Sequence, residues 1–422
     1  MGNGVVCFDD KSDTYLLEKE HELLIAVPNE EFGLAVVKLW NETFPEYIDH
    51  INYEVVKDRS AIYYLNNPRY DLIYISEYEL PLLMDKVLTV DENTFDSFKP
   101  YMVEKFAQVI NEDEYRFVPI AYQGFLFAYD EELLTKAGLS LLDSDLDGLP
   151  DSIDTWEEIF ERITYQANKF ETLDIEEYLP IALNEKYSFY TVLTAGGWQM
   201  FEKNKADDPG FTTSAFKGSL RFVYELGKYD WSLNDDKDDD HSFRYEEVLS
   251  KQSALFTMVS PWMFYDEYEK INNTNYRFSR MPSYNGHILE PLVDIDGYAI
   301  SVDSECPNLA HQLLMLIRSE LGLQRLIDET DLALVIEFND ESTINIIDQN
   351  KQDMIIAYKY SSEEPFLALS NDTTIRAWQM YYDIDLLSVI RDLFAHTITV
   401  SEAQAQINEM ANEWLKERGE IK

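Results

Sequence analysis

Residues 22–56 read ELLIAVPNEEFGLAVVKLWNETFPEYIDHINYEVV and predict a strand, a helix and a second strand in succession. The apolar run from Glu22 to Val27 is typical of a buried strand, Glu30 to Phe44 has helical periodicity, and Ile51 to Val56 predicts the second strand. A third apolar run, DLIYI at residues 71–75, predicts a further strand. This βαβ opening favours an α/β fold whose first hundred residues are doubly wound.

The rest of the chain indicates a second lobe. Residues 117–129 (FVPIAYQGFLFAY) form a long extended segment, with a proline near its start and a glycine in its middle. Such a segment is typical of a strand that changes direction or crosses between lobes. Helical patterns dominate after it, interrupted by strand-like runs at Ala254–Val259 and Gly297–Val302. A chain of 422 residues also exceeds what one hydrophobic core usually organises, so two lobes are expected.

Composition excludes several classes of partner. The chain has 80 Asp and Glu against 34 Lys and Arg, a net charge of -46 that would repel nucleic acids and anionic lipid surfaces. Cys7 and Cys306 are too few and too far apart for a disulfide framework or a zinc site. No run approaches the ~20 apolar residues of a membrane span, and MGNGVVC at the N-terminus lacks the regions of a secretory signal. An exported protein would therefore be in its mature form.

An acidic loop has the spacing of a calcium site. Residues 143–154 read DSDLDGLPDSID, with carboxylates at loop positions one, three, five, nine and twelve and a glycine at position six, as in EF-hand loops. The last carboxylate is an aspartate where a longer glutamate is usual. The alternative is an acidic turn without a metal that leads into a helix, because residues 155–158 (TWEE) form a capping box. The loop predicts one structural Ca²⁺, whose ligands would be Asp143, Asp145, Asp147, the carbonyl of Leu149, Asp151 and Asp154.

Catalytic motifs are missing from the sequence. It contains no Walker loop, no dinucleotide glycine fingerprint, no HExxH motif and no nucleophile elbow. Paired acids such as Glu77 and Glu79 leave glycoside hydrolysis as an alternative, and a calcium-stabilised surface adhesin is another. We expect a protein that is not an enzyme.

An ordered series of short motifs resembles the maltose-binding protein family, the family 1 extracellular solute-binding proteins of ABC importers. Their order and spacing along nearly the whole chain carry the resemblance. The motifs are LLIAV (23–27), YDLIY (70–74), VPIAY (118–122), FLFAYD (125–130), TWEEI (155–159), AGGW (195–198), SPW (260–262), GYAI (297–300), the helix at 310–324 and TVSEA (399–403). Gly196, Gly197 and Trp198 within this series are interpreted as helix punctuation and packing.

The resemblance implies a fold of periplasmic binding protein-like class II. In this fold two α/β lobes are joined by a multi-crossing hinge, with a ligand cleft between them. The N-terminal lobe would contain residues 17–124 plus 292–335, and the C-terminal lobe residues 125–291 plus 336–422. The implied function is capture of a carbohydrate, resembling maltose or an oligosaccharide, for delivery to a membrane permease and its ATPase. The protein would be a monomer, extracellular or periplasmic, and GVVC at residues 4–7 leaves a lipid anchor open.

The resemblance also implies which residues contact the solute. Aromatic rings would stack on sugar rings, while carboxylates and amides would bind hydroxyl groups. Where the maltose pattern has an aromatic residue and an Asp-Arg pair, this chain has Ser76-Glu77-Tyr78-Glu79, so an amino sugar, a polyamine or a peptide also stays open. The implied contacts are Trp262, Glu185, Tyr187, Gln123, Glu30, Glu31, Glu77, Tyr78, Glu79 and Tyr382.

Overall fold

The computed structural model describes residues 6–77, 79–101, 115–162, 186–200, 208–228, 255–260, 275–336, 344–361 and 379–418. The chain divides into two compact units. Unit 1 contains Met1–Gln123 and Val293–Ile355, and unit 2 contains Gly124–Leu292, Ile356–Glu363 and Asn371–Lys422, while Glu364–Ser370 is assigned to unit 1. Among the described residues, no helix is both long enough and apolar enough to cross a membrane.

The unit boundaries lie close to the expected lobe boundaries at two of three points. The chain passes between units at 123/124 and 292/293, against expected positions of 124/125 and 291/292. The third passage lies at 355/356 rather than 335/336. The segment before it packs on unit 1, because the Nζ of Lys351 donates to the carbonyls of Ile327 and Thr330 at 2.7 and 2.6 Å.

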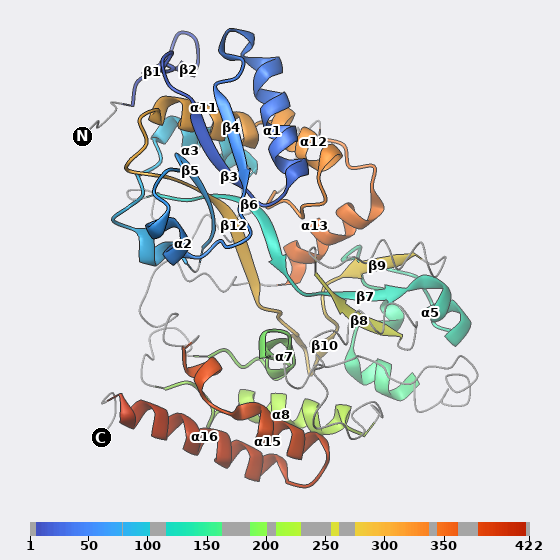
Figure 1. The fold of residues 1–422 in the computed structure, drawn as a ribbon. Coiled ribbons are helices and arrows are strands. Elements are labelled where there is room, and N and C mark those ends of the chain that lie inside the picture. Colours follow the sequence, from blue (N-terminus) through green and yellow to red (C-terminus); the bar gives the residue numbers. More distant parts are fainter. Residues whose placement is uncertain are drawn as a thin grey trace. The chain divides into compact units, whose positions relative to one another are not determined.

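Unit 1 is built on a five-stranded mixed sheet with the order β4-β3-β5-β12-β6 (Figure 1). Strand β3 runs parallel to β4 and β5, and β12 runs antiparallel to β5. The strands are β3 (Leu23–Val27), β4 (Ile51–Val55), β5 (Leu72–Ser76), β6 (Val118–Gly124) and β12 (Val293–Ile300), with a separate hairpin of β1 (Phe8–Asp9) and β2 (Thr14–Tyr15). The α/β class predicted from residues 22–56 is confirmed.

Helices cover this sheet with apolar faces. Helix α1 begins where the Asn29 side chain accepts a hydrogen bond from the Phe32 amide, and it buries Val36, Leu39 and Trp40. It packs against α12, which in turn packs against α11. The helices of unit 1 are α1 (Glu30–Thr43), α2 (Ala61–Asn66), α3 (Glu92–Phe98), α11 (Pro307–Arg318) and α12 (Glu320–Glu329), with short 3₁₀ turns at Pro45–Tyr47, Leu80–Leu83 and Lys99–Tyr101.

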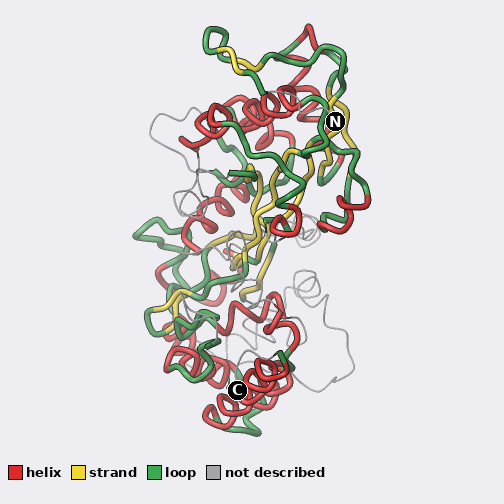
Figure 2. The backbone as a smooth tube through the Cα atoms, turned by 90° about the vertical axis from the view of Figure 1, so that its left-hand side faces the viewer, coloured by secondary structure: helices red, strands yellow, loops and turns green. Residues whose placement is uncertain are grey.

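Unit 2 combines a three-stranded antiparallel sheet, of order β8-β7-β9, with a helical layer. Helices α8, α15 and α16 pack on one another, and Figure 2 shows helices gathered around the C-terminus. The elements are β7 (Leu126–Asp130), α5 (Glu131–Ala137), a 3₁₀ turn (Asp151–Ile153), α7 (Lys186–Leu193), α8 (Ser214–Leu226), β8 (Phe256–Val259), β9 (Tyr276–Ser279), β10 (Ser283–Tyr284), β11 (His287–Ile288), α15 (Leu386–Phe394) and α16 (Val400–Glu417). Helix α13 (Gln349–Ser361) contains the third passage between units.

Candidate functional site

A polar pocket lies at one edge of the unit 1 sheet. Residues 57–60 follow the end of β4, and Glu79 follows the end of β5. Because β3, β4 and β5 are parallel, their carboxyl ends meet at the same edge, where ligands of open α/β sheets commonly bind. We call this the unit 1 pocket, which has a volume of about 270 Å³ and is lined by Lys57, Asp58, Arg59, Ser60, Ser76, Glu79, Gln123, Asp294 and Asp296.

The lining of the unit 1 pocket is charged, with acids in excess. Arg59 forms an ion pair with Asp296, whose side chain is only 1% exposed, whereas the Arg59 side chain is 37% exposed. Glu79 accepts a hydrogen bond from the amide of Ala61 at 2.9 Å. Hydrogen bonds from the side chain and the amide of Ser60 lower the pKa of Asp58. The pocket therefore offers fixed carboxylate acceptors beside a guanidinium donor.

Glu77 lies in the interior of unit 1 beside this pocket. Its side chain is fully buried, and one carboxylate oxygen accepts a hydrogen bond from the amide of Ile295. Its own amide donates to the carbonyl of Ile295 at 2.9 Å. Burial, and then the charge of Asp294, raise the pKa of Glu77 well above its usual range. Glu77 therefore ties the start of β12 to the end of β5 and does not line the pocket.

The structure brings only some of the expected contacts into the unit 1 pocket. Gln123 and Glu79 line it. Glu30 and Glu31 are exposed in the first turn of α1, where Glu30 accepts a hydrogen bond from the Tyr53 hydroxyl at 2.7 Å, so these two acids do not line the pocket. Trp262, Glu185 and Tyr78 lie outside the described residues.

The two remaining expected contacts lie in unit 2. The ring of Tyr187, in α7, is 5.8 Å from that of Phe125. Tyr382 is 44% exposed, and its carbonyl accepts a hydrogen bond from the Nζ of Lys186 at 2.7 Å. Neither residue lines the unit 2 pocket near residues 283–288, which is described below.

Five charged residues of the unit 1 pocket are absent from the predicted contacts, namely Lys57, Asp58, Arg59, Asp294 and Asp296. The predicted contacts follow the first and third strands, and none of them follows the second strand. The same rule, that loops at the carboxyl ends of parallel strands form the site, points to residues 57–60. The last two of these aspartates belong to a strand that begins at Val293 and not at the expected Gly297.

Unit 2 has a second pocket, of about 230 Å³, near the β10–β11 hairpin. Gly197 has a φ of +75°, and a Cβ at this position would lie 2.6 Å from the His287 ring. The amide of Glu290 donates to Thr194 Oγ1 at 2.7 Å. Trp198 is buried, which confirms its expected packing role, although its position in a pocket was not foreseen. The lining residues are Thr194, Gly197, Trp198, Gln199, Gly286, His287, Ile288, Glu290 and Tyr360.

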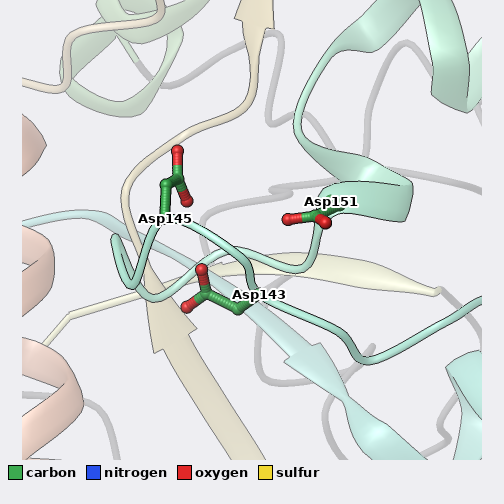
Figure 3. A group of neighbouring side chains, drawn as sticks. All are labelled: Asp143, Asp145 and Asp151. Carbon is green, nitrogen blue, oxygen red and sulfur yellow. The ribbon is translucent and has the colours of Figure 1, made fainter.

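The acidic loop of unit 2 gathers three of its carboxylates. One oxygen each from Asp143, Asp145 and Asp151 lies within 4.8 Å of the other two (Figure 3). Asp143 accepts hydrogen bonds from the amides of Leu146 and Gly148 at 2.8 and 3.0 Å. The charge of Asp147 is the main cause that raises the pKa of Asp145. Like charges are thus held close together in this turn.

The other two acids of this loop are directed to Arg280. The Arg280 side chain is 7% exposed and forms ion pairs with Asp147, at 2.5 Å, and with Asp154. Its Nη1 also donates to the carbonyl of Met281 at 3.0 Å. Leu149, expected to supply a carbonyl ligand, has a buried side chain and donates its amide to Asp147 Oδ1 at 2.9 Å. The five acids of the expected ligand set therefore form two groups. Three of them lie close together, and the other two pair with Arg280.

Comparison with known families accounts for most of the chain. Residues 55–333, more than half of the 422, match the family model for bacterial extracellular solute-binding protein. No curated protein matches the chain. The matched region includes strands β5, β12 and β6 of the unit 1 sheet and every residue of the unit 1 pocket. The chain therefore belongs to the bacterial extracellular solute-binding proteins.

Proposed function

We propose that this chain is the substrate-binding subunit of an ABC importer and that it captures a carbohydrate for delivery to the permease. Membership of the solute-binding family gives the substrate-binding role. The observation that supports a polyhydroxylated solute is the lining of the unit 1 pocket, where Glu79 and Asp294 stand beside Arg59 and Gln123. A sugar hydroxyl both donates and accepts, so carboxylates, an amide and a guanidinium together match it.

Further features belong to the same proposal. Trp262 would stack on a sugar ring, with Glu185, Tyr187, Tyr78 and Tyr382 as additional contacts. The partners would be the permease and the ATPase, and the protein would act as an extracellular monomer. Cys7, whose amide donates to Asn308 Oδ1 at 2.7 Å, would carry a lipid anchor.

Replacing Glu79 by Gln is expected to weaken solute binding about 10- to 100-fold, because a hydrogen bond to a charged group is worth about 1.5–3 kcal/mol. The solute is first identified by thermal shift against neutral sugars, amino sugars, polyamines and peptides, since a ligand of the native state raises the unfolding midpoint. Affinity for that solute is then measured by titration calorimetry for the wild type and the variant.

Glu31→Gln is the matched control, because Glu31 is an exposed acid outside the unit 1 pocket. It should bind with wild-type affinity. Equal affinity of Glu79→Gln and the wild type would show that the solute binds elsewhere. A response to polyamines or peptides alone would keep the binding role and replace the sugar with the alternative solute, and turnover of a glycoside would favour an enzyme.

We also propose that the acidic loop binds one structural calcium ion. The spacing of residues 143–154 and the close approach of Asp143, Asp145 and Asp151 support it. A divalent cation would relieve the repulsion that raises the pKa of Asp145. Since Asp147 and Asp154 pair with Arg280, main-chain carbonyls and water would complete the six to eight oxygens that Ca²⁺ requires.

Calcium is expected to raise the thermal unfolding midpoint of chelator-treated protein, and the double variant Asp143→Asn, Asp145→Asn should lose this shift. Asp143 accepts from the amides of Leu146 and Gly148 on separate oxygens, so asparagine keeps an acceptor for one of these two bonds while the charge is removed. Asp10→Asn, at an exposed acid of unit 1, serves as the control and should keep the shift. An equal calcium shift in the double variant would place the ion elsewhere.

A further inference from the structure

Arg318 is a buried cation without a carboxylate partner. It is the last residue of α11, and it is 1% exposed. Its Nη1 donates to the carbonyl of Val335 at 2.9 Å, whereas its Nε and Nη2 are buried and have no hydrogen-bond partner. Across the described parts of the chain, no Asp or Glu forms an ion pair with it. The positive charge of Arg318 is therefore not neutralised by the residues around it.

A second buried donor lies near this guanidinium. The Tyr115 hydroxyl is buried and has no hydrogen-bond partner. Both side chains pack on Phe98. The guanidinium carbon of Arg318 lies 5.8 Å from the Phe98 ring centroid, and the ring centroids of Tyr115 and Phe98 are 5.7 Å apart. The Arg318 charge acts on Tyr115 and partly offsets the rise in pKa that burial gives the hydroxyl. The two groups are thus within electrostatic reach of each other.

Both groups are donors at neutral pH. Burial lowers the pKa of Arg318 only to about 10, so the guanidinium keeps its charge. Burial raises the pKa of Tyr115, so the phenol keeps its proton. The Nε and Nη2 of Arg318 and the oxygen of Tyr115 therefore present N–H and O–H groups without an acceptor.

An anion would satisfy this arrangement better than water. A buried donor without an acceptor destabilises the folded state, and a buried charge without a counter-charge destabilises it further. A water molecule can accept from the donors, but it cannot neutralise the charge. A single monovalent ion supplies both functions, whereas a divalent oxyanion would bring a second charge and more acceptor atoms than the donors here can satisfy.

We propose that unit 1 binds a chloride ion between the guanidinium of Arg318 and the hydroxyl of Tyr115. Chloride is monovalent and spherical, so it accepts hydrogen bonds from donors that converge from different directions. The aromatic rings of Phe95 and Phe98 pack around Tyr115 and shield the site from water. None of these residues lines the unit 1 pocket, so the site is independent of solute binding.

The first test compares thermal unfolding of the full chain in sodium chloride and in sodium gluconate at equal ionic strength. Wild-type protein should unfold at a higher midpoint in chloride, with a shift that rises with the logarithm of chloride concentration above the dissociation constant. Arg318→Met should abolish the difference between the two salts, and Tyr115→Phe, which removes only the hydroxyl, should reduce it. Arg325→Met is the matched control, because the Arg325 side chain in unit 1 is 16% exposed and forms ion pairs with Glu42 and Glu329, and it should keep the wild-type difference.

Equal wild-type midpoints in the two salts would overturn the proposal, as would an undiminished chloride effect in Tyr115→Phe. The measurement on Tyr115→Phe does not depend on whether Arg318→Met folds. Crystals of the wild type grown in bromide give a direct measurement. An anomalous peak within hydrogen-bonding distance of Arg318 Nε or Nη2 supports the ion, whereas density without an anomalous signal identifies a buried water and overturns it.

Discussion

Replacing Arg280 by methionine is expected to lower the free energy of unfolding by about 3–5 kcal/mol, as for other buried ion pairs that lose one partner. Arg280 is 7% exposed and binds both Asp147 and Asp154. The variant leaves the Asp147 carboxylate buried without its cation. Chemical denaturation of the chelator-treated protein measures the loss in the unfolding transition of unit 2.

Arg277→Met is the matched control for Arg280→Met. Arg277 pairs with Glu131 on partly exposed side chains, 29% and 36% exposed, and such surface pairs contribute about 0–1 kcal/mol. Calcium should restore part of the stability of Arg280→Met, because Asp147 and Asp154 become available as ligands in the proposed calcium site. Losses of equal size in the two arginine variants would show that Arg280 is no more important than a surface residue.

Replacing Gly196 by alanine is expected to lower the free energy of unfolding by about 3 kcal/mol, at the upper end of the range for overpacking. A Cβ at Gly196 would lie 2.1 Å from the Ala215 carbonyl oxygen and 2.5 Å from the Ser219 nitrogen. Both are backbone atoms of α8, so no side-chain rotation can relieve the overlap. The helix would have to move away from the turn that follows α7.

Gly286→Ala is the control that separates the steric overlap at Gly196 from the backbone cost of replacing a glycine. Gly286 has a φ of +77° but no atom within 4 Å of the added Cβ, so only the left-handed backbone opposes alanine, at about 1–2 kcal/mol. Denaturation curves of the two variants are compared in the same buffer. A cost for Gly196→Ala no greater than that for Gly286→Ala would mean that α8 shifts without loss of packing.

The fold of unit 1 could be predicted from local patterns, with one informative exception. Strands β3, β4 and β5 follow continuous or alternating apolar runs, and α1 has a clear helical period with a capping asparagine. Strand β12 begins at Val293, four residues before the expected position. The acids in VDIDGYAI are unfavourable in strands, yet the apolar residues between them are buried.

The candidate sites depended on contacts that sequence spacing does not contain. The loop spacing directed five acids to one cation, whereas a distant arginine, Arg280, holds two of them. Gln123 and Glu79 were expected from their places after strands, but the pairing of Arg59 with Asp296 joins residues 237 positions apart. Charge partners of this kind follow from tertiary packing, and a single sequence carries no local signal for them.

The position of β12 in the unit 1 sheet has a consequence for synthesis and secretion. Strand β12, at Val293–Ile300, lies between β5 and β6, which precede it by more than 160 residues. A ribosome must therefore make about three quarters of the 422-residue chain before this sheet can close. Until then β6 lacks its neighbour in the sheet, and the nascent chain cannot complete its first unit. Such delayed closure leaves the polypeptide incompletely folded for most of its synthesis, which suits a member of an extracellular protein family.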